Sequence, residues 1–155
     1  MPGSLDDAKK RTGGLDQLLS GLADDYDVAF LDCPPSVSLV SENVLRAADV
    51  LLVPLIPATL SLRTYAQLIR FVADARRPRP DVVAFLSMAD RRKRLHREVS
   101  DTLPRDHGRI ADTVVPSMAL IERMAERRAP VPAYAPTSTA AKCYEQLWEE
   151  VSDGS

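Results

Sequence analysis

Short apolar runs alternate along the chain with longer stretches in which apolar residues recur at helical spacing. Helical periodicity predicts helices over Leu15–Ala23, Val37–Ala47, Leu60–Ala75, Arg91–Leu103, Ser117–Arg127 and Thr137–Val151. The short runs are apolar at consecutive positions, as expected for strands that are covered by helices on both faces of a parallel sheet. These predicted strands are Val28–Leu31, Val50–Val53, Val82–Leu86 and Thr113–Val115. The alternation predicts an α/β fold with a parallel sheet flanked by helices.

Length and charge add few constraints to this picture. A chain of 155 residues is the size of one domain, and a formal charge of −2 indicates no particular partner, so any basic surface must be local. Cys33 and Cys143 lie far apart without metal-type spacing, which favours a reducing, cytoplasmic location. The first residues lack the apolar region of a secretory signal, and no apolar run approaches the ~20 residues of a membrane helix. We therefore expect no membrane association.

Polar or special residues follow the predicted strands, at the edge where ligands bind to parallel α/β sheets. Asp32 follows the first run in "FLDCPPS", Pro54 the second, Asp90 the third and Pro116 the fourth. An aspartate that closes a buried strand can hold Mg²⁺ beside the phosphates of a nucleotide, directly or through water. The alternative is that Asp32 caps the next helix or turns the chain before the two prolines.

The stretch "YDVAFLDCPPSVSLVSENVLRAADVLLVPLIPATLSLRTYAQL" resembles the Walker B and switch II region of ParA/Soj-type partition ATPases, in the MinD/ParA P-loop superfamily. "SMADRRKRLHREV" resembles the strand and loop on the base side of that family's nucleotide site. "DTVVPSMALIERMAERRAPVPAYAPTSTAAKCYEQLWEEV" resembles its C-terminal part. The resemblance implies a P-loop NTPase-like fold over residues 14–151, with an irregular lead at 1–13 and a tail at 152–155.

This resemblance also implies ATP and Mg²⁺ as ligands and assigns site residues. Asp32 occupies the catalytic, Mg²⁺-linked Walker B position, and Pro34 and Pro35 begin the switch that senses the γ-phosphate. The implied base-side residues are Met88, Asp90, Val115, Pro116 and Met118. The alternative for the two methionines is that they fill gaps in the core. Cys33 is not expected to be a nucleophile, because the neighbouring carboxylate disfavours the thiolate.

The phosphate-binding half of such a site is not found in the sequence. The glycine pair at 13 and 14 lacks the Gly-Lys-Ser/Thr order, and no predicted strand precedes it, as a P-loop requires. We therefore interpret the fold as incomplete, with the N-terminal P-loop strand missing, and expect no ATP hydrolysis by this chain alone. Two explanations stay open: a fragment of an ordinary ATPase gene, or a P-loop-less relative that works as a partner module.

In the intact family the resemblance implies ATP-dependent dimerisation, non-specific DNA binding by the dimer, and release on hydrolysis stimulated by a partition partner. The implied role is DNA segregation or intracellular positioning, in the cytoplasm and at the nucleoid. The alternative is a non-enzymatic module that pairs with a full-length ATPase or a partition partner.

A basic run provides the candidate DNA contacts. Cations at a helix start oppose the helix dipole, so polyanion binding is one reason for their presence. They are Arg91, Arg92, Lys93, Arg94 and Arg97. The other interpretation is a solvated surface loop. His96 and His107 have no metal-type spacing and are expected at the surface.

Overall fold

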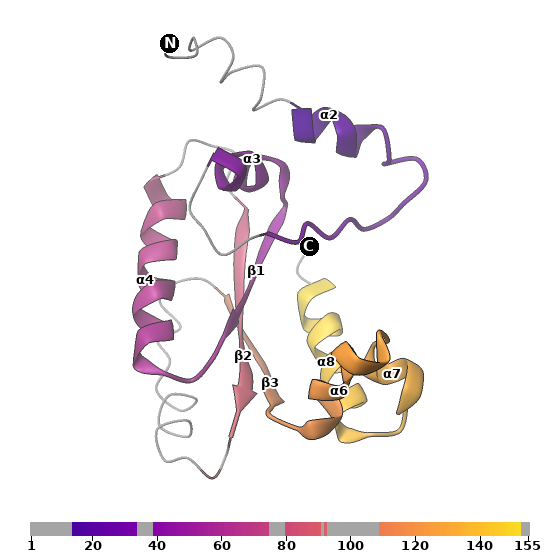
Figure 1. Ribbon diagram of the computed structural model, residues 1–155. Helices are drawn as coiled ribbons and strands as arrows, with labels where there is room; N and C mark the ends of the chain where they lie inside the picture. The colour runs from indigo at the N-terminus through magenta and orange to yellow at the C-terminus, as the bar shows by residue number, and fades with distance from the viewer. Residues whose placement is uncertain (1–13, 34–38, 75–79, 91, 93–108, 153–155) are drawn as a thin grey trace.

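A three-stranded parallel sheet forms the centre of the computed structural model, which describes residues 14–33, 39–74, 80–90, 92 and 109–152. β1 (Val50–Leu55), β2 (Asp81–Ala89) and β3 (Arg109–Pro116) lie side by side in that order (Figure 1). Three of the four predicted strands are therefore confirmed, and β3 begins earlier than the apolar run indicates. The predicted α/β class with a parallel sheet is also confirmed.

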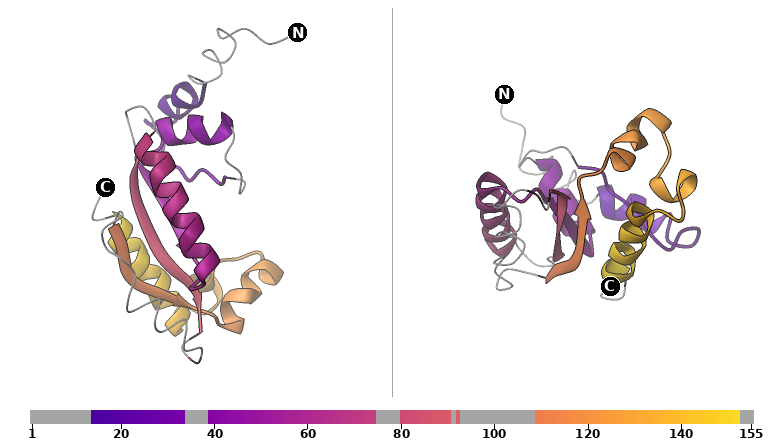
Figure 2. Two further views of the ribbon diagram at one scale, coloured as in Figure 1. Left: turned by 90° about the vertical axis from the view of Figure 1, so that its left-hand side faces the viewer. Right: turned by 90° about the horizontal axis from the view of Figure 1, so that it is seen from below.

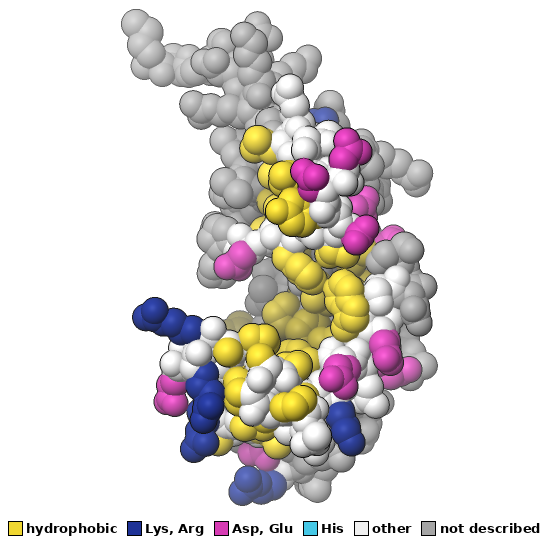
Figure 3. All heavy atoms as spheres, turned by 90° about the vertical axis from the view of Figure 1, so that its right-hand side faces the viewer, with side chains coloured by type: hydrophobic (Ala, Val, Ile, Leu, Met, Phe, Trp, Pro, Cys, Tyr) yellow, Lys and Arg dark blue, Asp and Glu magenta, His cyan; other side chains and the backbone are white. Residues whose placement is uncertain are grey.

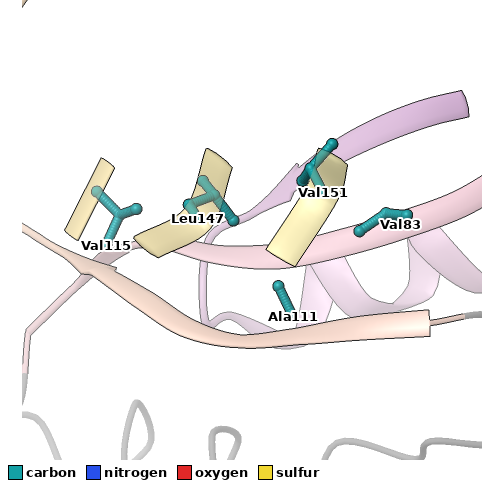
Figure 4. Packing of buried hydrophobic residues seen from close by; sticks show 5 residues of the cluster. All are labelled: Val83, Ala111, Val115, Leu147 and Val151. Carbon is teal, nitrogen blue, oxygen red and sulfur yellow. The ribbon is translucent and has the colours of Figure 1, made fainter. Parts of the chain in front are cut away.

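One long helix covers each face of the sheet. α4 (Thr59–Asp74) lies on one face and α8 (Thr139–Ser152) on the other (Figure 2). Successive residues of a strand point to opposite faces, so Ala84 packs with Tyr65 of α4, whereas Val83 packs with α8. Figure 4 shows the α8 side of the core, formed by Val83, Ala111, Val115, Leu147 and Val151. Consecutive apolar residues of the strands thus pack on opposite faces of the sheet, one against α4 and the next against α8.

Shorter helices surround these layers: α2 (Gly14–Ser20), α3 (Leu39–Ala47), α6 (Ala119–Arg127) and α7 (Val131–Tyr134). α7 falls inside the proline-rich connection before α8, where Pro130 and Pro132 suit the first turn of a helix. Val131 packs without any exposed surface against Ala140 and Ala141, which seats α7 on the start of α8. Within the described ranges, no helix is both long enough and apolar enough to cross a membrane. Apart from Arg92, the predicted helix Arg91–Leu103 lies outside the described residues.

The predicted strand Val28–Leu31 is wrong. These residues adopt no regular structure, and Val28 and Phe30 are 53% and 75% exposed. A strand needs a neighbouring strand to pair its backbone N–H and C=O groups. Among the described residues, β1 pairs with β2 alone, so no strand lies beside this segment.

Candidate functional site

The carboxyl ends of β2 and β3 form the best-defined part of the candidate site. Ala89 pairs with Pro116, and the Ser117 N–H donates a hydrogen bond to the Ala89 carbonyl at 3.0 Å. Because parallel strands end at the same edge, residues 88–90 and 115–118 lie together there. The structure therefore brings together the five residues assigned to the base side of a nucleotide.

An irregular register shapes this edge. Between the pairs Leu86–Val114 and Ala89–Pro116, β2 has one residue more than β3, and Met88 lies in this extra stretch. Met88 has φ of 54°, a left-handed conformation that is uncommon for residues other than glycine. Its side chain is 51% exposed, so Met88 does not fill the core. The bulge thus presents an apolar side chain to solvent at the end of the sheet.

The other base-side residues differ in exposure. Val115 is buried against α8, and Met118 packs with the cluster around Val131. The core-filling alternative is therefore the better description of Met118, whereas Met88 is exposed. Asp90 is half-buried, and its Oδ1 accepts a hydrogen bond from the Arg92 N–H at 3.0 Å. The exposed Arg92 side chain also approaches this carboxylate, with Nε and Oδ1 3.7 Å apart.

Asp32 does not lie with these residues. It is exposed, and the described segment from Gly21 to Cys33 lies at the end of the molecule where β1 and β2 begin (Figures 1 and 2). Phe30, two residues before Asp32, contacts Trp148 of α8, with ring centroids 6.1 Å apart. The residues after Cys33, including Pro34 and Pro35, lie outside the described residues. The role of all three as switch and Mg²⁺-linked residues stays a prediction.

No metal site is formed by the described side chains. Within the described ranges, no group of three or more His, Cys, Asp or Glu side chains could hold a metal ion. Asp32 is a single carboxylate away from the base-side residues, so the arrangement does not fit Mg²⁺ binding by the protein alone. The Cys33 thiol donates a weak hydrogen bond to the Leu31 carbonyl, with sulfur and oxygen 3.4 Å apart.

Of the five cations in the basic run, only Arg92 belongs to the described residues. The other four, Arg91, Lys93, Arg94 and Arg97, lie outside them. The structure adds cations that the sequence reasoning missed. Arg123, Arg127 and Arg128 on and after α6 are exposed, and the Arg127 guanidinium lies 5.0 Å from the centre of the Tyr134 ring. The arginines of "ERMAERR" were the available signal.

The comparisons with known proteins agree with the layered parallel sheet. Residues 1–82 match the model of a protein family described as an AAA domain, and that match begins at residue 1, where no structure is described. The chromosome-partitioning ATPase Soj of Treponema pallidum is 26% identical over 95% of this chain and 60% of its own length. The chromosome partitioning protein ParA of Caulobacter vibrioides is 29% identical over 81% of this chain and 49% of its own length.

A solved structure shows the same fold. The cell division ATPase MinD of Pyrococcus furiosus superimposes with a TM-score of 0.68 at 17% identity, over 93% of this chain and 59% of MinD. The chain thus spans between 49% and 60% of the length of these relatives. The family match, the similarity to Soj and ParA and the shared fold together show the family. The chain belongs to the AAA-domain family, among the P-loop ATPases of ParA/MinD type.

Proposed function

We propose that the protein acts in DNA segregation or intracellular positioning as a ParA-like ATPase that binds ATP. The observation that carries this proposal is the meeting of residues 88–90 and 115–118 at the carboxyl ends of β2 and β3. In an open α/β sheet, this is the edge at which ligands bind. The names of the relatives, a chromosome-partitioning ATPase and a chromosome partitioning protein, support the same function.

The proposed site has two parts. The base part comprises Met88, Asp90, Val115, Pro116 and Met118, with Met88 as the exposed apolar contact. The phosphate part would comprise Asp32, next to Mg²⁺, with Pro34 and Pro35 as the start of the switch. The closeness of residues 88–90 and 115–118 supports the base part, whereas Asp32 lies elsewhere, and we derive no catalytic step through Mg²⁺.

Further parts of the proposal concern partners and location. We propose that the protein forms an ATP-dependent homodimer, binds DNA non-specifically and responds to a partition partner, in the cytoplasm and at the nucleoid. The exposed Arg92 and the arginines of α6 support polyanion binding, because such contacts are made with phosphate oxygens by exposed cations.

A second candidate function is a non-enzymatic module that pairs with a full-length ATPase or a partition partner. The position of the Asp32 segment favours it. That segment lies outside the sheet and exposes apolar side chains, and it does not reach the base-side residues.

Calorimetric titration with Mg-ATP tests the ATPase proposal. We expect saturable binding, and we expect it to weaken in Met88→Gly because the apolar contact is lost. Glycine is chosen because it adopts the positive φ without strain, so the change removes only the side chain. Asp32→Ala tests the phosphate part in the same assay, and GTP replaces ATP to test selection of the base. Leu60→Ser, a change at an exposed apolar residue on α4, is the control. Absence of binding by the unmodified chain would favour the partner module.

A further inference from the structure

Glu150 of α8 directs its carboxylate inward, to the strand that leads to the base-side residues. Figure 3 shows the side of the molecule on which α8 lies, where other acidic side chains are exposed at the surface. Glu150 is half-buried, and its carboxylate accepts the N–H of Asp112 at 2.7 Å and that of Thr113 at 3.0 Å. The Thr113 hydroxyl donates a further hydrogen bond to it. One helix side chain thus binds two consecutive residues in the middle of β3.

The two residues that Glu150 binds lie where β3 is longer than β2. Between the pairs Ala84–Ile110 and Leu86–Val114, β3 has two residues more than β2. Because side chains alternate between the two faces of a sheet, an excess of two residues leaves the later residues of β3 on the same faces as before. The excess therefore changes how far β3 reaches along β2, and not which of its side chains enter the core.

The same residue of α8 also holds the beginning of β3. The guanidinium of Arg109, the first residue of β3, donates to the Glu150 carbonyl oxygen, with Nη2 and oxygen 2.7 Å apart. On either side of the extra residues, Ala111 and Val115 pack toward α8 (Figure 4). Glu150 therefore fixes β3 to α8 at two points, at its start through the carbonyl and at the extra residues through the carboxylate.

The place of the base-side residues depends on this excess. Each residue advances a strand by about 3.3 Å, so two residues correspond to about 6.6 Å along β2. With the excess held as it is, Pro116 pairs with Ala89, and the Ser117 N–H donates to the Ala89 carbonyl at 3.0 Å. Bulges commonly re-aim the residues that follow them, and here those residues are 115–118.

We propose that Glu150 is a positioning residue for the base part of the site. By binding the extra residues of β3, it sets how far the strand reaches and keeps residues 115–118 against residues 88–90. The effect on ligand binding rests on the proposed nucleotide function, whereas the effect on the geometry of the strand ends does not.

Amide hydrogen exchange followed by NMR tests the geometry without any ligand. The probe is the Ser117 N–H, and the reference is the Asp81 N–H, which donates to the Asp49 carbonyl at 2.8 Å at the other end of the sheet. In Glu150→Ala, we expect the protection of Ser117 to fall about tenfold relative to that of Asp81, because the strand ends open locally. Glu150→Gln keeps one acceptor oxygen and should give a smaller change in the same direction, which also provides a result if the alanine variant does not fold.

A control separates positioning from a general loss of stability. Ser138→Ala removes a hydrogen bond at the start of α8 and leaves the contacts of Glu150 with β3 intact. We expect this variant to leave the ratio of protection between Ser117 and Asp81 unchanged. An unchanged ratio in Glu150→Ala, or an equal change in Ser138→Ala, would overturn the positioning role.

Calorimetric titration with Mg-ATP then measures the effect on the site. Affinity should fall about tenfold in Glu150→Ala, fall less in Glu150→Gln, and stay unchanged in Ser138→Ala and in the exposed neighbour variant Glu149→Ala. Full affinity in Glu150→Ala would contradict the role of Glu150 in ligand binding. If the unmodified protein binds no Mg-ATP, the proposed nucleotide function fails, and the exchange ratio alone decides whether Glu150 positions the strand ends.

Discussion

At the scale of single residues, Glu150 of α8 holds β3 where the sheet is irregular. Between the pairs Ala84–Ile110 and Leu86–Val114, β3 has two residues more than β2, so the backbone of Asp112 and Thr113 departs from the ladder. The Glu150 carboxylate accepts the N–H of Asp112 at 2.7 Å and that of Thr113 at 3.0 Å, as well as the Thr113 hydroxyl. One side chain thus accepts the N–H groups of two consecutive residues at the bulge.

Removing this carboxylate should be costly. We expect Glu150→Ala to lower the free energy of unfolding by about 1.5 to 3 kcal/mol, because it removes hydrogen bonds to a charged group and one donor is partly buried. Urea denaturation measures the change. Glu149→Ala is the matched control, since its exposed side chain should contribute less than about 0.5 kcal/mol. Equal effects of the two changes would contradict this role of Glu150.

Tyr144 makes stability depend on pH in the alkaline range. Burial raises the pKa of its phenol above the ordinary value, and charge on Tyr134 and Cys143 adds to the shift. The folded state therefore favours the neutral phenol, whose stabilising effect is complete below the unfolded pKa of about 10 and is lost as pH rises through the higher folded pKa. In urea denaturation from pH 8 to 11, Tyr144→Phe should lose less stability than the unmodified protein. Parallel curves for the two proteins would show that Tyr144 does not contribute.

At the scale of elements, α8 depends on a defined start as well as on its buried face. Ser138 precedes its first residue, and its hydroxyl accepts the Ala141 N–H at 3.1 Å, as an N-cap side chain does. At the other end, Arg109 of β3 donates to the Glu150 carbonyl at 2.7 Å. Both ends of α8 are therefore fixed by side chains, while Leu147 and Val151 attach its middle and end to the sheet.

The cap can be tested separately from the packing. Ser138→Ala should lower the free energy of unfolding by about 1 kcal/mol, because one N–H at the helix start loses its partner. Thermal and urea denaturation measure the loss. Ser138→Asp keeps an acceptor at this position and should retain most of the stability of the unmodified protein. Equal free energies of unfolding for Ser138→Ala and Ser138→Asp would argue against a capping role.

At the scale of the whole molecule, the two ends of the sheet carry different surfaces. The base-side residues lie where the strands end, and the segment that contains Asp32 lies where β1 and β2 begin. Exposed arginines lie on and after α6, whereas the described residues 14–33 carry only acidic charges. The small net charge of −2 thus conceals an unequal distribution of charge over the surface.

DNA binding, as proposed above, should depend on the basic run. We expect the triple variant Arg91→Ala/Arg92→Ala/Arg94→Ala to weaken DNA binding and to flatten its salt dependence by about 0.9 for each phosphate that is no longer neutralised. Affinity measured over a series of salt concentrations gives the slope. The variant Arg63→Ala/Arg70→Ala removes exposed cations from α4 and should leave the slope unchanged. An unchanged slope in the triple variant would discard the basic run as a DNA-binding element.

By itself the sequence determined the α/β class, the three paired strands, their helices and the family, because apolar periodicity and the "DCPPS" stretch are local patterns. Tertiary structure decided which apolar runs become strands. Val28–Leu31 is as apolar as β1 but has no neighbouring strand to pair with among the described residues. The tertiary structure also determined where the bulges lie, at Met88 and at Asp112 and Thr113, because the register of a sheet depends on two strands together. The contact of Phe30 with Trp148 joins residues far apart in the chain, and no local pattern could predict it.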